Sequence, residues 1–194
     1  MIQYHNGYPI FISTSNTLDL TSLHALVKFL HPIIIKNFKK DAGYEQDDLT
    51  SRHLYYNLLS IKQACIYELY KFIVISIKEF LMETNVSYNN LYIQVWANLT
   101  TKNTQIVKHK HTAFLNGHIG INAEPSSTFY LLSDTNADIK NKNGQLCMTI
   151  SDLVHFTSIW EQHEPRTTIA FEVIKDITNT QEVAFSNFYP LYLE

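Results

Sequence analysis

The sequence predicts a mainly β protein with α-helices: a double-sheet jelly roll whose N-terminal helices pack outside one sheet. Two observations indicate this class. Before about residue 85, apolar side chains recur at helical spacing over long segments. After Asn85 the pattern changes to alternation and short apolar runs broken by Asn, Ser, Gly and Asp, which is typical of successive strands. We expect residues 1–194 to form a single domain, with a helical part to about residue 85 and a jelly-roll core over about 86–194.

The first part of the chain is expected to contain one strand and two helices. Residues Tyr8–Ser13 have the pattern of a strand, and their proline suits an edge or a first position. Apolar side chains then repeat at helical spacing over Leu23–His31, and Pro32 should kink or end that helix. A polar stretch over Lys39–Thr50 predicts a loop. The apolar stripe over Ile66–Leu81 predicts a long second helix that packs on the core.

The second part of the chain is expected to contain about eight short strands with turn signals between them, which favours a jelly roll. The polar segment Asn136–Asn143 is expected to be a loop. The predicted strands are Leu91–Asn98, Thr104–His109, Gly117–Ile121, Ser127–Leu132, Gln145–Ile150, Leu153–Ile159, Thr167–Ile174 and Val183–Tyr189.

Composition and charge are those of an ordinary globular protein, with 45% hydrophobic residues, 13% aromatic residues and a formal net charge of −3. The lysines are spread along the chain. Their densest group, Lys36, Lys39 and Lys40, is too small for a basic groove, and we interpret it as a solvated helix end. We therefore expect no nucleic-acid partner.

Cysteine usage and the lengths of the apolar runs bear on the compartment. Cys65 and Cys147 lie in a predicted helix and a predicted strand, which favours free buried thiols in a reducing compartment. No signal-peptide pattern is found at the N-terminus. The most apolar run, Phe72–Ile75, is flanked by charges, whereas a spanning helix needs roughly 20 largely apolar residues. We expect a cytoplasmic protein without membrane contact.

Histidines and a rare arginine indicate where chemistry could occur. His109 and His111 are two positions apart, so on a strand they share one face, and neutral imidazole is the commonest ligand for iron, zinc, copper and nickel. Arg166 is one of two arginines in the chain, and its guanidinium can grip a carboxylate through two parallel hydrogen bonds. A surface ion pair is the alternative reading of that arginine.

A third ligand would have to come from a distant strand. His155 precedes Arg166 by 11 positions, so two antiparallel strands would bring both to one cavity. His163 is the competing candidate, but it lies three positions from Arg166, which is too close for separate strands. His118 could line the pocket, although such a histidine is more often packed and hydrogen-bonded.

Seven segments between Trp96 and Val173 form a pattern. They are Trp96-Ala97-Asn98, His109-Lys110-His111-Thr112, Leu115-Asn116-Gly117-His118-Ile119-Gly120, Gly144-Gln145-Leu146, Thr149-Ile150-Ser151, His155 and Arg166-Thr167-Thr168-Ile169-Ala170-Phe171. The pattern resembles the iron(II)- and 2-oxoglutarate-dependent oxygenases. Their motifs run Trp-x-Asn, H-x-H-Pro, Leu-Ser-Gly-Val-Tyr-Tyr, Gly-x-Leu, Phe-Pro-Ser, a distal His and Arg-x-Ser-x-Ala-Phe.

The resemblance implies a double-stranded β-helix and a cofactor site. Iron(II) would be held by His109, His111 and His155. Arg166 and Thr168 would bind the distal carboxylate of 2-oxoglutarate, assisted by Asn98. The implied activity is hydroxylation of a C–H bond in a small molecule or a peptide side chain. The aromatic-rich helices leave room for a homodimer.

The sequence departs from the resembled pattern in three motif elements. The usual ligand set is two histidines and one carboxylate, but the H-x-D position holds His111, which makes the metal site one charge more positive. Thr112 replaces a proline, and Thr149-Ile150-Ser151 replaces Phe-Pro-Ser.

Two other functions remain open. A cupin-type dioxygenase or isomerase without 2-oxoglutarate would suit three histidines, although the glutamate usual in cupins is missing from Thr112–Gly117. A non-catalytic jelly-roll binding domain would bind neither metal nor 2-oxoglutarate.

Overall fold

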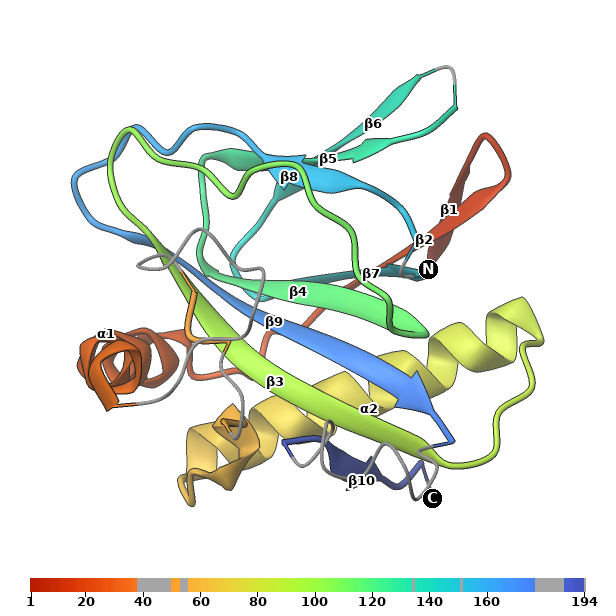
Figure 1. The fold of residues 1–194 in the computed structure, drawn as a ribbon, viewed down its shortest axis with the longest axis horizontal. Coiled ribbons are helices and arrows are strands. Elements are labelled where there is room, and N and C mark those ends of the chain that lie inside the picture. Colours follow the sequence, from red (N-terminus) through yellow and green to blue (C-terminus); the bar gives the residue numbers. More distant parts are fainter. Residues whose placement is uncertain (38–49, 53–55, 134, 151, 177–186, 194) are drawn as a thin grey trace.

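The computed structural model describes residues 1–37, 50–52, 56–133, 135–150, 152–176 and 187–193. Within these residues, two sheets lie one above the other, and the helices cover the outer side of the larger sheet (Figure 1). The strands are β1 (Ile2–His5), β2 (Tyr8–Thr14), β3 (Leu91–Thr100), β4 (Leu115–Asn122), β5 (Ser126–Leu131), β6 (Asn136–Asn141), β7 (Gln145–Ile150), β8 (His155–Thr157), β9 (Arg166–Lys175) and β10 (Tyr189–Leu191). The helices are α1 (Leu20–Asn37), the short 3-10 helix η1 (Leu58–Ser60) and α2 (Ala64–Thr84).

The strand order confirms the predicted fold class. The larger sheet runs β1-β2-β7-β4-β9-β3-β10 and the smaller one β6-β5-β8, with antiparallel pairing between neighbours. Chain neighbours are therefore often not sheet neighbours, which is the mark of a jelly roll. Both helices were predicted. Helix α2 ends at Asn85, whose left-handed backbone (φ 52°) lets its amide donate to carbonyls of the last turn.

The helices and the larger sheet share one apolar core. Leu69, Ile73 and Ile77 of α2 are fully buried and belong to the same cluster as Ile169 and Val173 of β9. Strand β9 is paired along its length with β3, and with β4 over most of it. Because side chains alternate between the two faces of a strand, β9 separates this core from the space between the sheets.

Pro32 was expected to kink or end helix α1, and the expectation that the helix ends there is wrong. The helix continues through Pro32 to Asn37. Proline removes one backbone donor. Ile34, two residues beyond it, is nevertheless buried in the core with Leu23 and Val27. Burial of the apolar stripe thus outweighs the lost hydrogen bond.

The prediction of a loop over Asn136–Asn143 is also wrong, because residues 136–141 form β6 and pair with β5. Exposed and buried positions alternate along β6, and Ala137, Ile139 and Asn141 are the buried ones. Two of these three buried side chains, those of Ala137 and Asn141, are small or polar. The alternation was therefore present in the sequence without a strong hydrophobic signal.

The predicted strand Thr104–His109 lies beside β8 but is not a regular strand. His109 and His155 exchange both backbone hydrogen bonds, at 3.0 and 2.9 Å. Nearer the start, the Ile106 amide donates to the Thr157 hydroxyl instead of a carbonyl, at 3.0 Å. This side-chain contact interrupts the ladder, as serine and threonine hydroxyls often do.

Three smaller expectations concern the rest of the chain. Both cysteines are buried and neither forms a disulfide, as predicted. The predicted strand Val183–Tyr189 overlaps β10 at Tyr189, and its residues 183–186 lie outside the described part of the chain. Residues 39–49 of the predicted loop, which include Lys39 and Lys40, also lie outside it. Among the described helices, none is long and apolar enough to cross a bilayer.

The close approach of β4 to the β6–β7 turn gives a first prediction. A Cβ added at Gly120 would lie 2.4 Å from the Lys142 carbonyl oxygen, a backbone atom that cannot rotate away. We expect Gly120→Ala to lower the free energy of unfolding by about 1–3 kcal/mol, as overpacking does. Urea unfolding measures it. The exposed Lys142 side chain supplies the control: Lys142→Ala leaves the carbonyl in place and should change stability by less than about 0.5 kcal/mol. An unchanged Gly120→Ala protein would contradict this packing.

Candidate metal centre and carboxylate pocket

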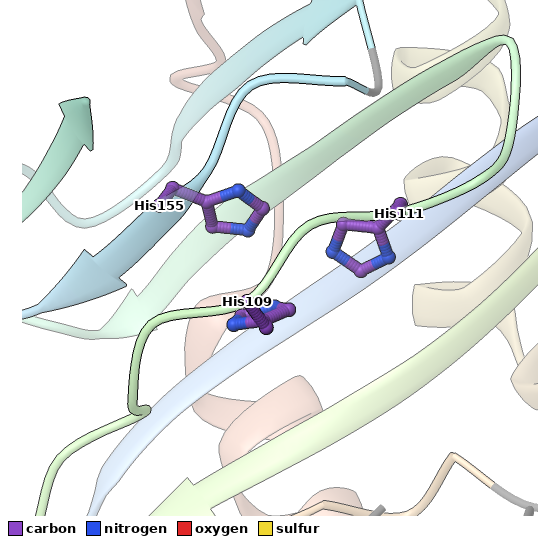
Figure 2. Close-up of side chains that lie close together, drawn as sticks. All are labelled: His109, His111 and His155. Atoms are coloured by element: carbon purple, nitrogen blue, oxygen red, sulfur yellow. The ribbon is translucent and has the colours of Figure 1, made fainter. Parts of the chain in front are cut away.

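Three predicted ligands come together between the sheets. His155 begins β8, and His109 and His111 lie on the segment that runs beside it (Figure 2). The ring centroids are 4.4 to 5.1 Å apart, and one candidate ligand atom from each ring lies within 4.8 Å of the other two. The competing candidate, His163, is exposed, and its Nε2 lies 3.4 Å from Lys102 Nζ, outside the cluster.

The hydrogen bonds of the three rings decide which nitrogen faces the centre. His109 Nδ1 donates to the Val107 carbonyl at 2.8 Å, and His155 Nδ1 donates to the Leu153 carbonyl at 3.1 Å. His111 Nδ1 contacts a carboxylate oxygen of Glu172. Since each acceptor requires the proton on Nδ1, the neutral form of each ring carries its lone pair on Nε2. This is the arrangement in which outer hydrogen bonds orient metal-binding histidines.

Burial keeps two of these rings in the neutral form that binds a metal. It lowers the pKa of His109 to about 4, with the neighbouring His111 and Arg52 adding to the shift. Burial and the two adjacent histidines hold the pKa of His155 well below its usual value. The rings are therefore unprotonated at neutral pH, and no proton has to leave them when a divalent ion binds.

Glu172 is the site residue that the sequence interpretation missed. Its side chain is 4% exposed, with Oε1 on His111 and Oε2 accepting from Arg52 Nη2 at 2.9 Å. Burial alone would raise the pKa of Glu172, but the His111 hydrogen bond and the Arg52 charge hold it below its usual value. One signal could have found it: Glu172 is the single acid inside the otherwise apolar run Ile169–Ile174, and a buried acid needs partners.

Arg166 is buried beside the same cavity and lacks a counter-ion among the described residues. It is 2% exposed, and its Nε and Nη1 have no hydrogen-bond partner there. Burial lowers the pKa of Arg166 to about 10, so the guanidinium stays charged at neutral pH. A buried cation of this kind is costly unless an anion joins it. The surface ion pair considered for this arginine is therefore not what the structure shows.

Several further polar side chains lie among the apolar residues of the cavity wall. Thr168 and Asn98, predicted to assist Arg166, line the cavity with the three histidines. Trp96 Nε1 and Asn116 Nδ2 are buried donors without a partner among the described residues. His118 also lines the cavity, but its Nε2 is 3.1 Å from Asn141 Oδ1, so it is packed and hydrogen-bonded. The donor set fits a ligand that presents acceptor oxygens.

Comparison with known proteins identifies the fold. Neither a protein-family profile nor a curated sequence matches the chain. Among solved structures, a prolyl-4-hydroxylase from Pseudomonas putida superposes with a TM-score of 0.60 at 10% identity, covering 89% of this chain and 95% of its own. The α-ketoglutarate-dependent carbocyclase SnoK from nogalamycin biosynthesis gives 0.60 at 10% identity, covering 97% and 89%. The related epimerase SnoN gives 0.54 at 11% identity, covering 86% and 77%.

The chain has the fold of the 2-oxoglutarate-dependent oxygenases. The double-stranded β-helix expected from the motif resemblance is thereby confirmed. The similar proteins are named a hydroxylase, a carbocyclase and an epimerase, so this fold is compatible with more than one reaction.

The lowered histidine pKa values predict how the metal-free protein responds to acid. Burial lowers the pKa of His109 and His118 to about 4, with Arg166 adding to the shift at His118, whereas both titrate near 6.5 in an unfolded chain. Between these values the unfolded chain binds more protons, so the free energy of unfolding falls as the pH falls from about 6.5 to about 4. Urea unfolding at several pH values, after chelator treatment, measures this slope.

Two variants test whether a buried histidine causes this dependence of the free energy of unfolding on pH. His118→Asn should flatten it, because one group that takes up a proton on unfolding is gone. His163→Asn changes an exposed histidine and should leave the slope as it is. A stability that stays constant from pH 7 to pH 4.5 would contradict the burial of these rings.

Proposed function

We propose that this protein is an iron(II)- and 2-oxoglutarate-dependent oxygenase that hydroxylates a small molecule or a peptide side chain. The observation that carries the proposal is the shared cavity: three histidines with converging rings and a buried arginine without a counter-ion line the same space. A metal and a carboxylate are the two ligand types that these groups select. The fold supports the proposal without deciding the reaction.

In this proposal, His109, His111 and His155 hold the iron through Nε2, because their Nδ1 protons are committed to other oxygens. When bound, iron and 2-oxoglutarate would enable dioxygen to oxidise a C–H bond of the substrate, with oxidative decarboxylation of the cosubstrate to succinate. The protein binds and orients these groups and the substrate, and it excludes water from the site.

Arg166 has the main binding role toward the cosubstrate. Its guanidinium would receive the distal carboxylate in place of water, with the Thr168 hydroxyl and Asn98 beside it. Because the arginine is buried, a charge-assisted pair there is screened far less than on the surface. Held at this end, the cosubstrate would present its other carboxylate and its keto group to the histidines, which line the same cavity.

One structural feature distinguishes this proposal from a cupin-type enzyme without 2-oxoglutarate. Three histidines suit both, but the cupin reading gives the buried, unpaired Arg166 guanidinium no role. A non-catalytic binding domain explains neither the arginine nor the alignment of three rings. The cytoplasmic location, the single domain and the homodimer stay predictions, as do the absent nucleic-acid and membrane partners.

Succinate formation tests the function without a known substrate. Such enzymes consume 2-oxoglutarate slowly without substrate, so protein supplied with iron(II), 2-oxoglutarate and dioxygen should release succinate above the protein-free rate. His155→Ala should abolish this release, because it removes one of three ligands. His163→Ala, an exposed histidine outside the cluster, should keep it. Equal activity of the two variants would contradict the ligand assignment.

A substitution at Arg166 separates cosubstrate binding from metal binding. Arg166→Lys keeps the positive charge but cannot form two parallel hydrogen bonds with a carboxylate. We expect the Kd for 2-oxoglutarate to rise about 10- to 100-fold, the effect of losing a charged hydrogen bond of about 1.5–3 kcal/mol. The Kd for Mn²⁺ should change little. Anaerobic calorimetry measures both, and equal loss of both, or of neither, counts against the assignment.

A further inference from the structure

The three histidine rings differ in the groups that hold their outer nitrogens. His109 and His155 donate Nδ1–H to neutral backbone carbonyls. His111 alone, of these three, faces a carboxylate, that of Glu172. His111 also stands at the position that supplies the carboxylate in the usual ligand set of two histidines and one carboxylate. The ligand set thus lacks a carboxylate, but the Glu172 carboxylate is hydrogen-bonded to one of the ligands, His111.

We propose that Glu172 is a positioning residue that fixes the His111 ring and strengthens its Nε2 as a metal ligand, so that an outer carboxylate compensates for the absent ligand carboxylate. This inference rests on the proposed metal site. A carboxylate that accepts the Nδ1 proton draws it away from the ring and increases electron density at Nε2, which a carbonyl does more weakly. The three ligands are then unequal, and His111 is the strongest donor.

The surroundings of Glu172 hold it in this role. Oε2 is occupied by Arg52 Nη2 at 2.9 Å, so Oε1 remains directed at the histidine. The Arg52 guanidinium lies over the Trp96 ring, 5.2 Å from its centroid, and that ring lies 6.3 Å from the His111 ring. Both carboxylate oxygens of Glu172 are thus held by partners, Oε1 by His111 and Oε2 by Arg52.

The position of Glu172 in the sheet makes this arrangement rigid. It lies on β9, paired with Gln94 of β3 on one side and Asn116 of β4 on the other. Arg166 is six residues earlier on the same strand, so the two side chains share a face. One strand therefore carries both the group that binds the cosubstrate and the group that orients a metal ligand.

Substitution by glutamine tests the role of the charge. In Glu172→Gln the amide oxygen can still accept the His111 proton, while the negative charge, and with it the ion pair with Arg52, is lost. With Co²⁺ as the probe, we expect affinity to fall about 10- to 100-fold, the usual effect of losing an outer partner, and the visible cobalt bands to shift. Circular dichroism and thermal unfolding verify that the variant is folded.

The control removes the same charge elsewhere. Glu164 is an exposed acid that pairs with His24 and Lys28, at 2.9 and 2.7 Å. Glu164→Gln should leave cobalt affinity and spectrum unchanged. Unchanged affinity and spectrum in folded Glu172→Gln would overturn the inference, as would a wild-type protein that does not bind Co²⁺.

Testing Glu172→Gln in a second variant, His111→Asp, distinguishes a positioning role of Glu172 from a merely structural one. His111→Asp restores the usual ligand set of two histidines and one carboxylate and removes the ring that Glu172 orients. In that background Glu172→Gln should no longer weaken Co²⁺ binding, because no imidazole transmits the effect. An equal loss in both backgrounds would show that Glu172 acts only on the fold and would overturn the inference.

The two proposals fail in different ways. If Co²⁺ binding depends on Glu172 as stated but 2-oxoglutarate does not bind, the proposed oxygenase function fails while the inference stands. If 2-oxoglutarate binds through Arg166 and Glu172→Gln leaves the metal unaffected, the inference alone fails.

Discussion

Strand β9 imposes the constraint on which the rest of the structure depends. It is paired with β3 from Arg166 to Lys175 and with β4 over most of the same length, so its register cannot slip without turning every side chain to the opposite face. Ile169 and Val173 enter the core shared with the helices. Arg166 and Glu172, at even-numbered positions, belong to the site between the sheets. Core packing thus fixes the spacing of the charged groups.

Much of the site could be predicted from the sequence because its signals are local. An H-x-H pair and an arginine in a chain with only two arginines are visible without knowing the fold. The structure brings His109, His111 and His155 together, and it places Thr168 and Asn98 on the cavity wall with Arg166. The choice of His155 over His163 also followed from spacing, since His163 was too near Arg166 to reach a separate strand.

What escaped prediction depends on contacts between distant residues. Glu172 is informative only once its register beside His111 and the approach of Arg52, 120 positions earlier, are known. Strand β6 has the right alternation, but its buried positions include an asparagine and an alanine, which carry little apolar signal. The segment before His109 has a strand-like sequence, yet the Thr157 hydroxyl takes one ladder position.

The proposed cavity binds a metal through three histidines and a carboxylate through Arg166. Anaerobic titration with iron(II) and then 2-oxoglutarate, followed in the visible range, measures both events in one experiment. We expect a charge-transfer band that forms only when both are present and that is lost in His109→Ala. Iron binding without the band would contradict the 2-oxoglutarate site and favour a cupin-type enzyme. Absence of iron binding would contradict the metal centre itself.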